Sequence, residues 1–469
     1  MRIFRKKRLL FARKRLLRAD MLIEFKVANY RSIRAEQTLS MVANADKELP
    51  QNLISCDHVP GLKGTKLVKA VALYGANASG KSNIVAALRF FAEFVRDSAT
   101  KLQPGAPTGA QPFKLDPACL TEPSKFEITA VINGIRTLYG IEMTRERVTS
   151  EYIVAYPNGR PQVWFERDWD EKKGKYTWSK SAAHFKHDAA LREKTRENAA
   201  FLSVAAQWNV KNAETVQNWV KQKVRFLDIE KALLFRGAAR ELISNERSHS
   251  ALAAMLARAD LGVAGMRTKT PDVLQMAKDI VRFGEAMGEE TLPIDEVAEV
   301  FRSPDAHPEL KQKLGDLRTK FVVPELLHHS FGGELVPLDF YAEESSGTRR
   351  YFDLMAEVFL AAAAKRFAVA DELENSLHPH LFHELIRTIF TVSVEESGAQ
   401  FLFTTHNPLL LDQTLLRRDQ IWFTEKDQEG ATRLYPLTDF KPRKDESLVK
   451  GYLAGRYGGI PFIPEGLKF

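Results

Sequence analysis

The most constraining feature of the sequence is the octapeptide GANASGKS at residues 75–82, which matches the pattern GxxxxGK[ST] at every fixed position. A largely apolar, strand-like run at 67–74 precedes it, and an amphipathic helical pattern from about Lys81 to Val95 follows it. A glycine-rich turn between a strand and a helix exposes successive backbone N–H groups, which bind phosphate together with the helix N-terminus. The sequence therefore predicts a phosphate-binding loop in an α/β domain.

The chemistry of this loop indicates a nucleoside triphosphate with magnesium, so ATP and Mg²⁺ are the expected ligands. Lys81 is placed to reach the β- and γ-phosphates, and the Ser82 hydroxyl to ligate Mg²⁺. A strand-to-helix turn with a chance lysine is the structural alternative, and the flanking strand and helix argue against it. The predicted ATP contacts in the loop are Gly75, Asn77, Ala78, Ser79, Gly80, Lys81 and Ser82.

A pair of acidic residues supplies the second half of the predicted site. The apolar run at 367–370 reads as a buried strand that delivers Asp371 and Glu372 to its carboxyl end, the edge where ligands bind in open α/β sheets. Asp371 is predicted to hold the magnesium shell, and Glu372 to polarise the water that attacks the γ-phosphate. The alternative is a helix N-cap. Two adjacent carboxylates are costly unless a cation or a hydrogen bond relieves them, which favours the functional interpretation.

Composition limits the partners and the compartment of the chain. The net charge of +8 arises in residues 1–20, which hold nine of the 68 basic and one of the 60 acidic residues; the remainder has 59 of each. Global charge therefore gives no argument for nucleic-acid binding. The two cysteines, Cys56 and Cys119, are too few for a disulfide framework, which fits a cytoplasmic protein. No run approaches the roughly 18 apolar residues of a membrane helix, so no membrane association is expected.

The pattern along the chain places a long insertion inside an α/β core. Residues 125–165 alternate apolar and polar groups around an Asn133-Gly134 turn, which predicts an antiparallel subdomain. Residues 187–320 have a mostly helical pattern, and strands and helices alternate again afterwards. The predicted fold class is α/β, with a mixed sheet, an antiparallel β subdomain and a large, mostly helical insertion. The predicted domains are a basic N-terminal extension outside the working fold (1–20), a lobe with the phosphate loop and β subdomain (21–186), the helical insertion (187–334) and a second lobe (335–469).

Two later segments complete a resemblance to an ABC-type P-loop ATPase of the SMC-like branch. The segment ESSGTRR at 344–350 stands where that family has its signature motif, with Ser345 and Gly347 at matching positions and threonine in place of glutamine. The segment TTHNP at 404–408 ends an apolar strand as the family's switch-histidine segment does. The resemblance implies that His406 senses the γ-phosphate; a capped surface histidine is the alternative.

Two further site residues follow from the same resemblance. The segment NYRS at 29–32 resembles the first-strand motif of these ATPases, which implies that Arg31 contacts ATP. Gln111 is the candidate for the Q-loop residue that ligates the metal. The resemblance covers residues 22–160 and 335–425.

A closer resemblance is to the stand-alone bacterial ATPases of the RloA/AriA kind. It rests on the segments ESSGTRR at 344–350, DELENSLHP at 371–379 and YLAGRYGGIP at 452–461. This resemblance implies the ATPase subunit of a two-gene phage-defence module, whose effector is a separate nuclease or toxin. The related OLD enzymes carry a Toprim nuclease domain in the same chain, and we find no matching acidic cluster after His406.

The resemblance also implies how the site is completed. In this family ATP is sandwiched between two subunits, so the loop at 75–82, Asp371, Glu372 and His406 of one copy would face Ser345 and Gly347 of another. ATP would then hold the subunits together and hydrolysis would release them, which makes the protein a nucleotide-gated switch. The expected partners are a second copy or a higher homo-oligomer, and a separate effector protein.

Two other functions are compatible with the motifs. The first is an SMC-like DNA-tethering or repair ATPase, against which the neutral core and the lack of a long coiled coil argue; nucleic-acid binding itself stays open. The second is the nucleotide-binding subunit of a transporter, which the long insertion and the altered signature disfavour. A salt-dependent DNA-binding assay separates the first from the regulatory switch.

Overall fold

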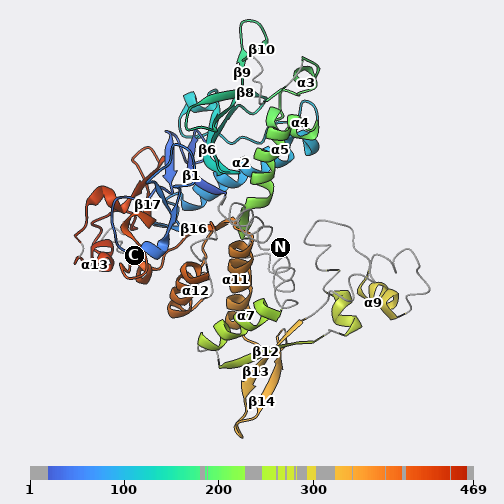
Figure 1. Cartoon of the computed structure of the whole chain (residues 1–469), viewed down its shortest axis with the longest axis vertical. Coiled ribbons are helices and arrows are strands. Elements are labelled where there is room, and N and C mark those ends of the chain that lie inside the picture. The colour runs from blue at the N-terminus through green and yellow to red at the C-terminus, as the bar shows by residue number, and fades with distance from the viewer. Residues whose placement is uncertain are drawn as a thin grey trace, which may run out of the picture. The chain divides into compact units, whose positions relative to one another are not determined.

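A mixed six-stranded sheet carries the predicted phosphate loop in the part of the chain that the structure describes (Figure 1). The strand order is β11–β15–β16–β5–β17–β18, in which only the last pairing, β17 with β18, is antiparallel. The three central strands β15, β16 and β5 are buried throughout, which is typical of parallel strands covered on both faces. The bounds are Val224–Leu227 (β11), Phe367–Ala370 (β15), Gln400–Thr404 (β16), Ala70–Gly75 (β5), Ile421–Lys426 (β17) and Thr432–Pro436 (β18).

A wholly antiparallel sheet of seven strands forms the predicted β subdomain among the described residues. Asn133 and Gly134 both have positive φ, 50° and 76°, as a two-residue hairpin turn requires. This confirms the mixed and antiparallel parts of the predicted fold class. The sheet has the order β10–β9–β8–β7–β6–β1–β2, with bounds Lys175–Trp178, Gln162–Asp170, Val148–Tyr156, Ile135–Met143, Ser124–Ile132, Met21–Ala28 and Gln37–Ser40. A two-stranded sheet pairs β3 (Leu53–Ser55) with β4 (Lys66–Val68).

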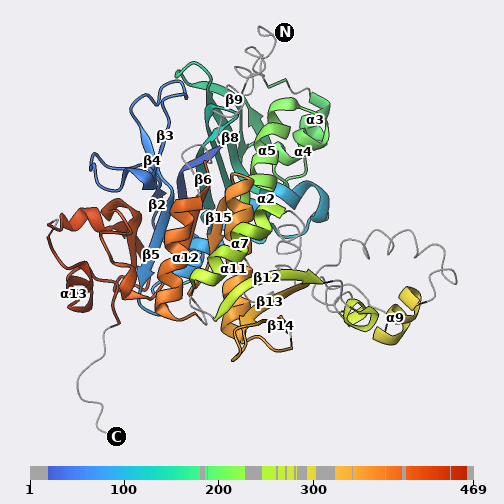
Figure 2. The ribbon, with the colours of Figure 1, turned by 60° about the horizontal axis from the view of Figure 1, so that its bottom comes forward.

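Helix α2 (Lys81–Lys101) begins at the phosphate loop and joins the two sheets in one core. Its buried positions include Ile84, Leu88, Phe91 and Val95, which recur at helical spacing and belong to a cluster shared with both sheets. Helices α4 (Phe201–Gln207) and α5 (Lys211–Lys223) pack on α2, as Figure 2 shows. The loop is thus attached to a fully packed helix. The remaining helices near this core are α3 (Ala189–Glu193) and α13 (Leu448–Leu453).

A buried ion pair attaches α4 to the antiparallel sheet. Glu151 on β8 and Arg167 on β9 both have 0% exposed side chains, and their charged groups approach to 2.7 Å. The Glu151 carboxylate also accepts hydrogen bonds from the Tyr139 hydroxyl (3.0 Å) and from the backbone N–H groups of Phe201 (2.7 Å) and Leu202 (2.9 Å). The carboxylate therefore satisfies N–H groups of the first turn of α4, which have no partner within the helix.

The structure is a computed structural model, and the residues that it describes divide into two units. The described residues are 20–179, 185–186, 189–227, 246–259, 262–269, 272–278, 281, 293–302, 323–340, 342–374, 377–392, 398–443 and 445–461. The first unit spans Met1–Leu227, Ala361–Leu373 and Ile389–Phe469; the second spans Asp228–Leu360 and Glu374–Thr388. Residues 1–19 of the predicted extension, 375–376 after the acid pair and much of the predicted insertion lie outside the described residues.

The second unit contains a small antiparallel sheet, β12–β13–β14, among its described residues. Helices α7, α9 and most of α11 and α12 belong to the same unit. None of the described helices is both long and apolar enough to cross a membrane. The bounds are Val263–Lys269 (β12), Val323–His329 (β13), Leu335–Asp339 (β14), Glu246–Arg258 (α7), Ile294–Arg302 (α9), Ser346–Ala363 (α11) and Pro379–Val392 (α12).

Candidate functional site

The two motif glycines leave no room for side chains in the phosphate loop. Gly80 has a φ of 110°, and a Cβ added there would lie 2.1 Å from the Thr432 hydroxyl. A Cβ on Gly75 would lie 2.5 Å from the hydroxyls of both Ser79 and Thr424. Those two hydroxyls contact each other at 2.7 Å, and the Thr432 hydroxyl donates to the Ser79 carbonyl at 3.1 Å. Residues of β17 and β18 thus pack directly against the two loop glycines, at positions where only glycine fits.

The Lys81 ammonium lies within the curve of the loop. Its side chain is 5% exposed, and Nζ donates to the carbonyls of Gly75 (2.8 Å) and Ala76 (3.1 Å). This places a positive charge at the start of α2, where the helix N-terminus adds its own partial positive charge. The exposed residues of the loop and the first helical turn are Asn77, Ala78 and Ser82.

The order of the parallel strands brings the predicted acids and histidine to the same sheet edge as the loop. Strand β16 lies between β15 and β5, with Ala370 opposite Phe403 and Thr404 opposite Leu73. The chain leaves all three strands at their carboxyl ends, at the acid pair, the histidine segment and the loop. This is the edge at which open α/β sheets bind ligands.

Thr404 contacts both predicted acids, and the sequence interpretation did not single it out. Its hydroxyl donates to Asp371 Oδ1 at 2.6 Å and accepts from the Glu372 backbone N–H at 2.7 Å. Thr404 is fully buried at the end of β16, while Asp371 is half-buried and Glu372 is exposed. The hydroxyl thus orients both predicted catalytic acids. A polar residue that directly follows the apolar run at 401–403 is the signal that could have revealed it.

The acid pair and the histidine segment both follow their strands through local turns of the backbone. Glu372 has a φ of 49°, a left-handed conformation that is uncommon outside glycine and that clusters at functional sites. His406 is exposed and follows the buried Thr405, whose hydroxyl accepts from the Asn407 N–H at 3.0 Å. That bond forms a tight turn around His406 directly after the strand.

Arg31 and Gln111, predicted separately, lie against each other. The Arg31 N–H donates to the Gln111 carbonyl at 2.6 Å, and Arg31 Nε donates to the Gln111 side-chain oxygen at 3.2 Å. The neighbouring Ser32 hydroxyl contacts Asn83 Nδ2 at 2.6 Å and the Thr432 hydroxyl at 2.8 Å. These bonds connect the 29–32 segment to the first turn of α2 and to the back of the loop.

The C-terminal glycines pack beside the phosphate loop. A Cβ on Gly459, whose φ is 67°, would lie 3.5 Å from the Gly75 Cα. The Tyr452 hydroxyl donates to the Gly459 carbonyl at 3.2 Å, and its ring lies 5.7 Å from that of Tyr74 on β5. Burial raises the pKa of Tyr457, with help from the Glu446 carboxylate, to about 12. The YLAGRYGGIP segment therefore supports the loop through packing and neutral hydroxyls.

The predicted signature segment belongs to the second unit. Ser345 accepts the Thr348 N–H at 3.0 Å, so it caps the N-terminus of the 18-residue helix α11. Gly347 lies in the first turn of α11, and the preceding Glu344 contacts His328 Nε2 at 2.7 Å. An exposed, capped helix N-terminus of this length is chemically suited to an anion.

The first unit offers a donor set that fits a triphosphate and Mg²⁺. A glycine cradle that a Cβ would fill and a buried lysine provide for phosphate. The exposed Ser82 hydroxyl and the half-buried Asp371 carboxylate provide oxygen ligands of the kind that Mg²⁺ prefers.

The family follows from a match along most of the chain. Residues 70–412 match the family described as "AAA domain, putative AbiEii toxin, Type IV TA system". The chain belongs to this family. The matched region includes the loop, the acid pair, the 344–350 segment and His406, so this AAA-family chain carries a P-loop ATPase domain. No curated protein matches the sequence.

Several solved structures of SMC heads are similar to the AAA-family chain at low identity. One is an SMC head bound to the C-terminal winged-helix domain of ScpA, with 12% identity and a TM-score of 0.41, covering 89% of this chain and 98% of that chain. A second is the SMC head domain of Thermotoga maritima, with 12% identity, a TM-score of 0.37 and coverage of 89% and 98%. A third is an SMC head with an extended coiled coil, bound to a ScpA domain from Pyrococcus furiosus, with 12% identity, a TM-score of 0.37 and coverage of 93% and 99%.

Proposed function

We propose that the protein binds and hydrolyses ATP with Mg²⁺ at the carboxyl edge of the mixed sheet. The observation that carries this proposal is the Thr404 hydroxyl, which contacts both Asp371 and Glu372. This contact lies at the same edge of the sheet at which β5 ends and the phosphate loop begins. Three neighbouring parallel strands thereby supply the phosphate loop, His406, and the pair formed by the metal ligand Asp371 and the general base Glu372.

The residues divide the chemistry of hydrolysis among themselves. Lys81 and the N–H groups of its loop hold the phosphates, while Ser82 and Asp371 would ligate Mg²⁺, with Gln111 as a further ligand. Bound Mg²⁺ would neutralise charge on the β- and γ-phosphates. The Glu372 carboxylate accepts a proton from the attacking water, and its exposed position keeps it accessible to that water. His406 contacts the γ-phosphate, and Arg31 contacts the nucleotide.

The site is completed by a second copy of the chain. Ser345 and Gly347 of the partner copy would place the N-terminus of its α11 against the γ-phosphate, which that helix dipole stabilises. ATP then belongs to both copies at once, so its binding favours a homodimer or higher homo-oligomer and its hydrolysis releases the copies.

This switch controls a separate effector protein, a nuclease or a toxin, in response to phage infection in the cytoplasm. Two observations support this role: the resemblance of the 371–379 and 452–461 segments to ATPases of the RloA/AriA kind, and the toxin and toxin–antitoxin system in the family description. Co-expression with the product of the adjacent gene tests it. We expect that product to co-purify with the chain. If it co-purified neither without nucleotide nor with ATP, the regulatory role would be contradicted.

The Glu372→Gln variant tests the catalytic proposal. Removing the base should leave ATP binding near the wild-type value, stop turnover and trap an ATP-dependent dimer, measured by calorimetry, phosphate release and light scattering after gel filtration. Glu429→Gln, at an exposed acid between β17 and β18, makes the same chemical change as a control and should hydrolyse ATP normally. Normal turnover in Glu372→Gln would show that another group activates the water.

A further inference from the structure

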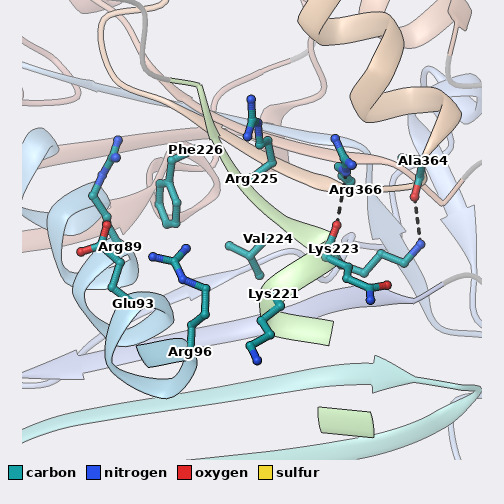
Figure 3. A pocket seen from close by; sticks show the side chains of 11 residues that line it. Arg89, Glu93, Arg96, Lys221, Lys223, Val224, Arg225, Phe226, Ala364 and Arg366 are labelled. Atoms are coloured by element: carbon teal, nitrogen blue, oxygen red, sulfur yellow. Dashed lines mark hydrogen bonds between the residues drawn. The ribbon is translucent and has the colours of Figure 1, made fainter. Parts of the chain in front are cut away.

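A basic cavity of about 540 Å³ lies in the first unit, and Figure 3 shows the side chains that line it. Its walls come from the middle of α2, from the junction of α5 and β11, and from the residues just before β15. The basic residues that line it are Arg89, Arg96, Lys221, Lys223, Arg225 and Arg366.

The cavity and the phosphate loop occupy different ends of shared elements. Arg366 immediately precedes β15 and Asp371 immediately follows it, so a four-residue strand of roughly 13 Å separates them. Arg89 lies eight residues, or roughly 12 Å, beyond Lys81 along α2. The basic cavity is therefore not an extension of the pocket that the loop forms.

Neutral groups hold two of the cations at the cavity wall. Lys223 Nζ donates to the Ala364 carbonyl at 2.8 Å, and Arg366 Nε donates to the Gln222 carbonyl at 3.2 Å (Figure 3). Carbonyl partners orient these groups without cancelling their charge, and each leaves further N–H donors of the same group for a ligand.

The described lining of the cavity is mostly basic. Among the described residues that line it, Glu93 is the one acid, against six basic residues. Outside the lining, Asp97 pairs with Arg96 at 2.9 Å and so reduces the charge further. The described lining thus presents more cations than acids to one small space, which favours a polyanion as its ligand.

We propose that this cavity binds a compact polyphosphate ligand of the size of a small molecule. Its volume lies in the range of small-ligand pockets, which is roughly 300–1,000 Å³. Its cations surround one concavity from three elements, which suits clustered phosphates better than the regularly spaced phosphates of a nucleic-acid strand. The Phe226 ring, with the Arg89 guanidinium carbon 4.6 Å from its centroid, gives the same cavity an apolar wall for an organic part of the ligand.

Calorimetry with inorganic tripolyphosphate tests this proposal. The titration uses the full chain with Lys81→Ala, in buffer without magnesium, so that the phosphate loop contributes little. We expect one bound tripolyphosphate per chain. Replacing the exposed Lys221 and Arg225 together by glutamate should weaken its affinity by roughly tenfold or more, because charge-assisted bonds become repulsive contacts.

A matched control separates a built site from general charge. Lys172→Glu with Lys175→Glu makes the same change in net charge at exposed positions around the turn before β10, and should leave the affinity unchanged. Equal weakening in the two double variants, or no binding to the parent chain, would overturn the proposal. Tighter binding of an oligonucleotide that competes with tripolyphosphate, and that is lost with Lys221 and Arg225, would replace it by a nucleic-acid surface.

Discussion

Replacing Thr404 with valine removes a hydroxyl that contacts both members of the acid pair. Valine keeps the shape of the fully buried side chain, so packing of β16 is retained. Two hydrogen bonds are lost: the 2.6 Å bond to Asp371 Oδ1 and the 2.7 Å bond from the Glu372 N–H. A bond to a charged group is worth about 1.5–3 kcal/mol. Losing an outer-shell partner of a metal ligand weakens metal affinity or activity by about 10–100-fold, and we expect that loss in magnesium-dependent ATP binding and turnover.

The assay is calorimetric ATP binding with and without magnesium, together with phosphate release. The magnesium-dependent part of the affinity should fall in Thr404→Val, while binding without the metal should change far less. Thr137→Val in β7 is the control: Thr137 is also buried, and its hydroxyl donates only to the nearby Ile135 carbonyl, at 3.3 Å, among the bonds of described residues. If Thr404→Val matched that control in both assays, Thr404 would not orient the acids.

Three further changes test the phosphate loop and two buried groups of the first unit. Gly80→Ala should abolish ATP binding, because its Cβ would lie 2.1 Å from the Thr432 hydroxyl; wild-type affinity in calorimetry would contradict this. Glu151→Gln should lower the free energy of unfolding by about 3–5 kcal/mol in urea denaturation, since the Arg167 charge loses its buried carboxylate; an unchanged midpoint would argue against it. Burial raises the pKa of Cys56 from 9.0 to about 12. The unfolded thiol therefore ionises first, so the free energy of unfolding should fall as the pH rises above 9.0, by up to about 1.4 kcal/mol per pH unit. Cys56→Ala should remove that slope in pH-dependent denaturation, and an unchanged slope would contradict this.

Local sequence patterns predicted the main elements of the nucleotide-binding edge. The octapeptide at 75–82 and the apolar runs before Asp371 and His406 each describe a strand and the residues at its end. Such patterns are readable because a buried parallel strand needs a continuous apolar run, and because the loop needs glycine where no Cβ fits. The structure shows that these runs form neighbouring strands of the mixed sheet, an order that the sequence analysis did not predict.

Contacts between distant segments could not be predicted in the same way. Val224–Leu227 falls within the predicted helical insertion, yet it pairs with β15 at the edge of the mixed sheet. A four-residue strand that directly follows a helix is too short for an alternating pattern to identify it. Its position is set by hydrogen bonds to a strand about 140 residues away in the sequence.

The sequence by itself determined which residues are predicted to carry phosphate chemistry, because those residue types and spacings are dictated by the ligand. Only the tertiary structure decided which groups support them. Thr404 reaches the acids, and Thr432 reaches the loop, across strands that are far apart in the chain. The basic cavity likewise exists only because α2, β11 and the start of β15 meet, since charge is concentrated by folding and not by order along the chain.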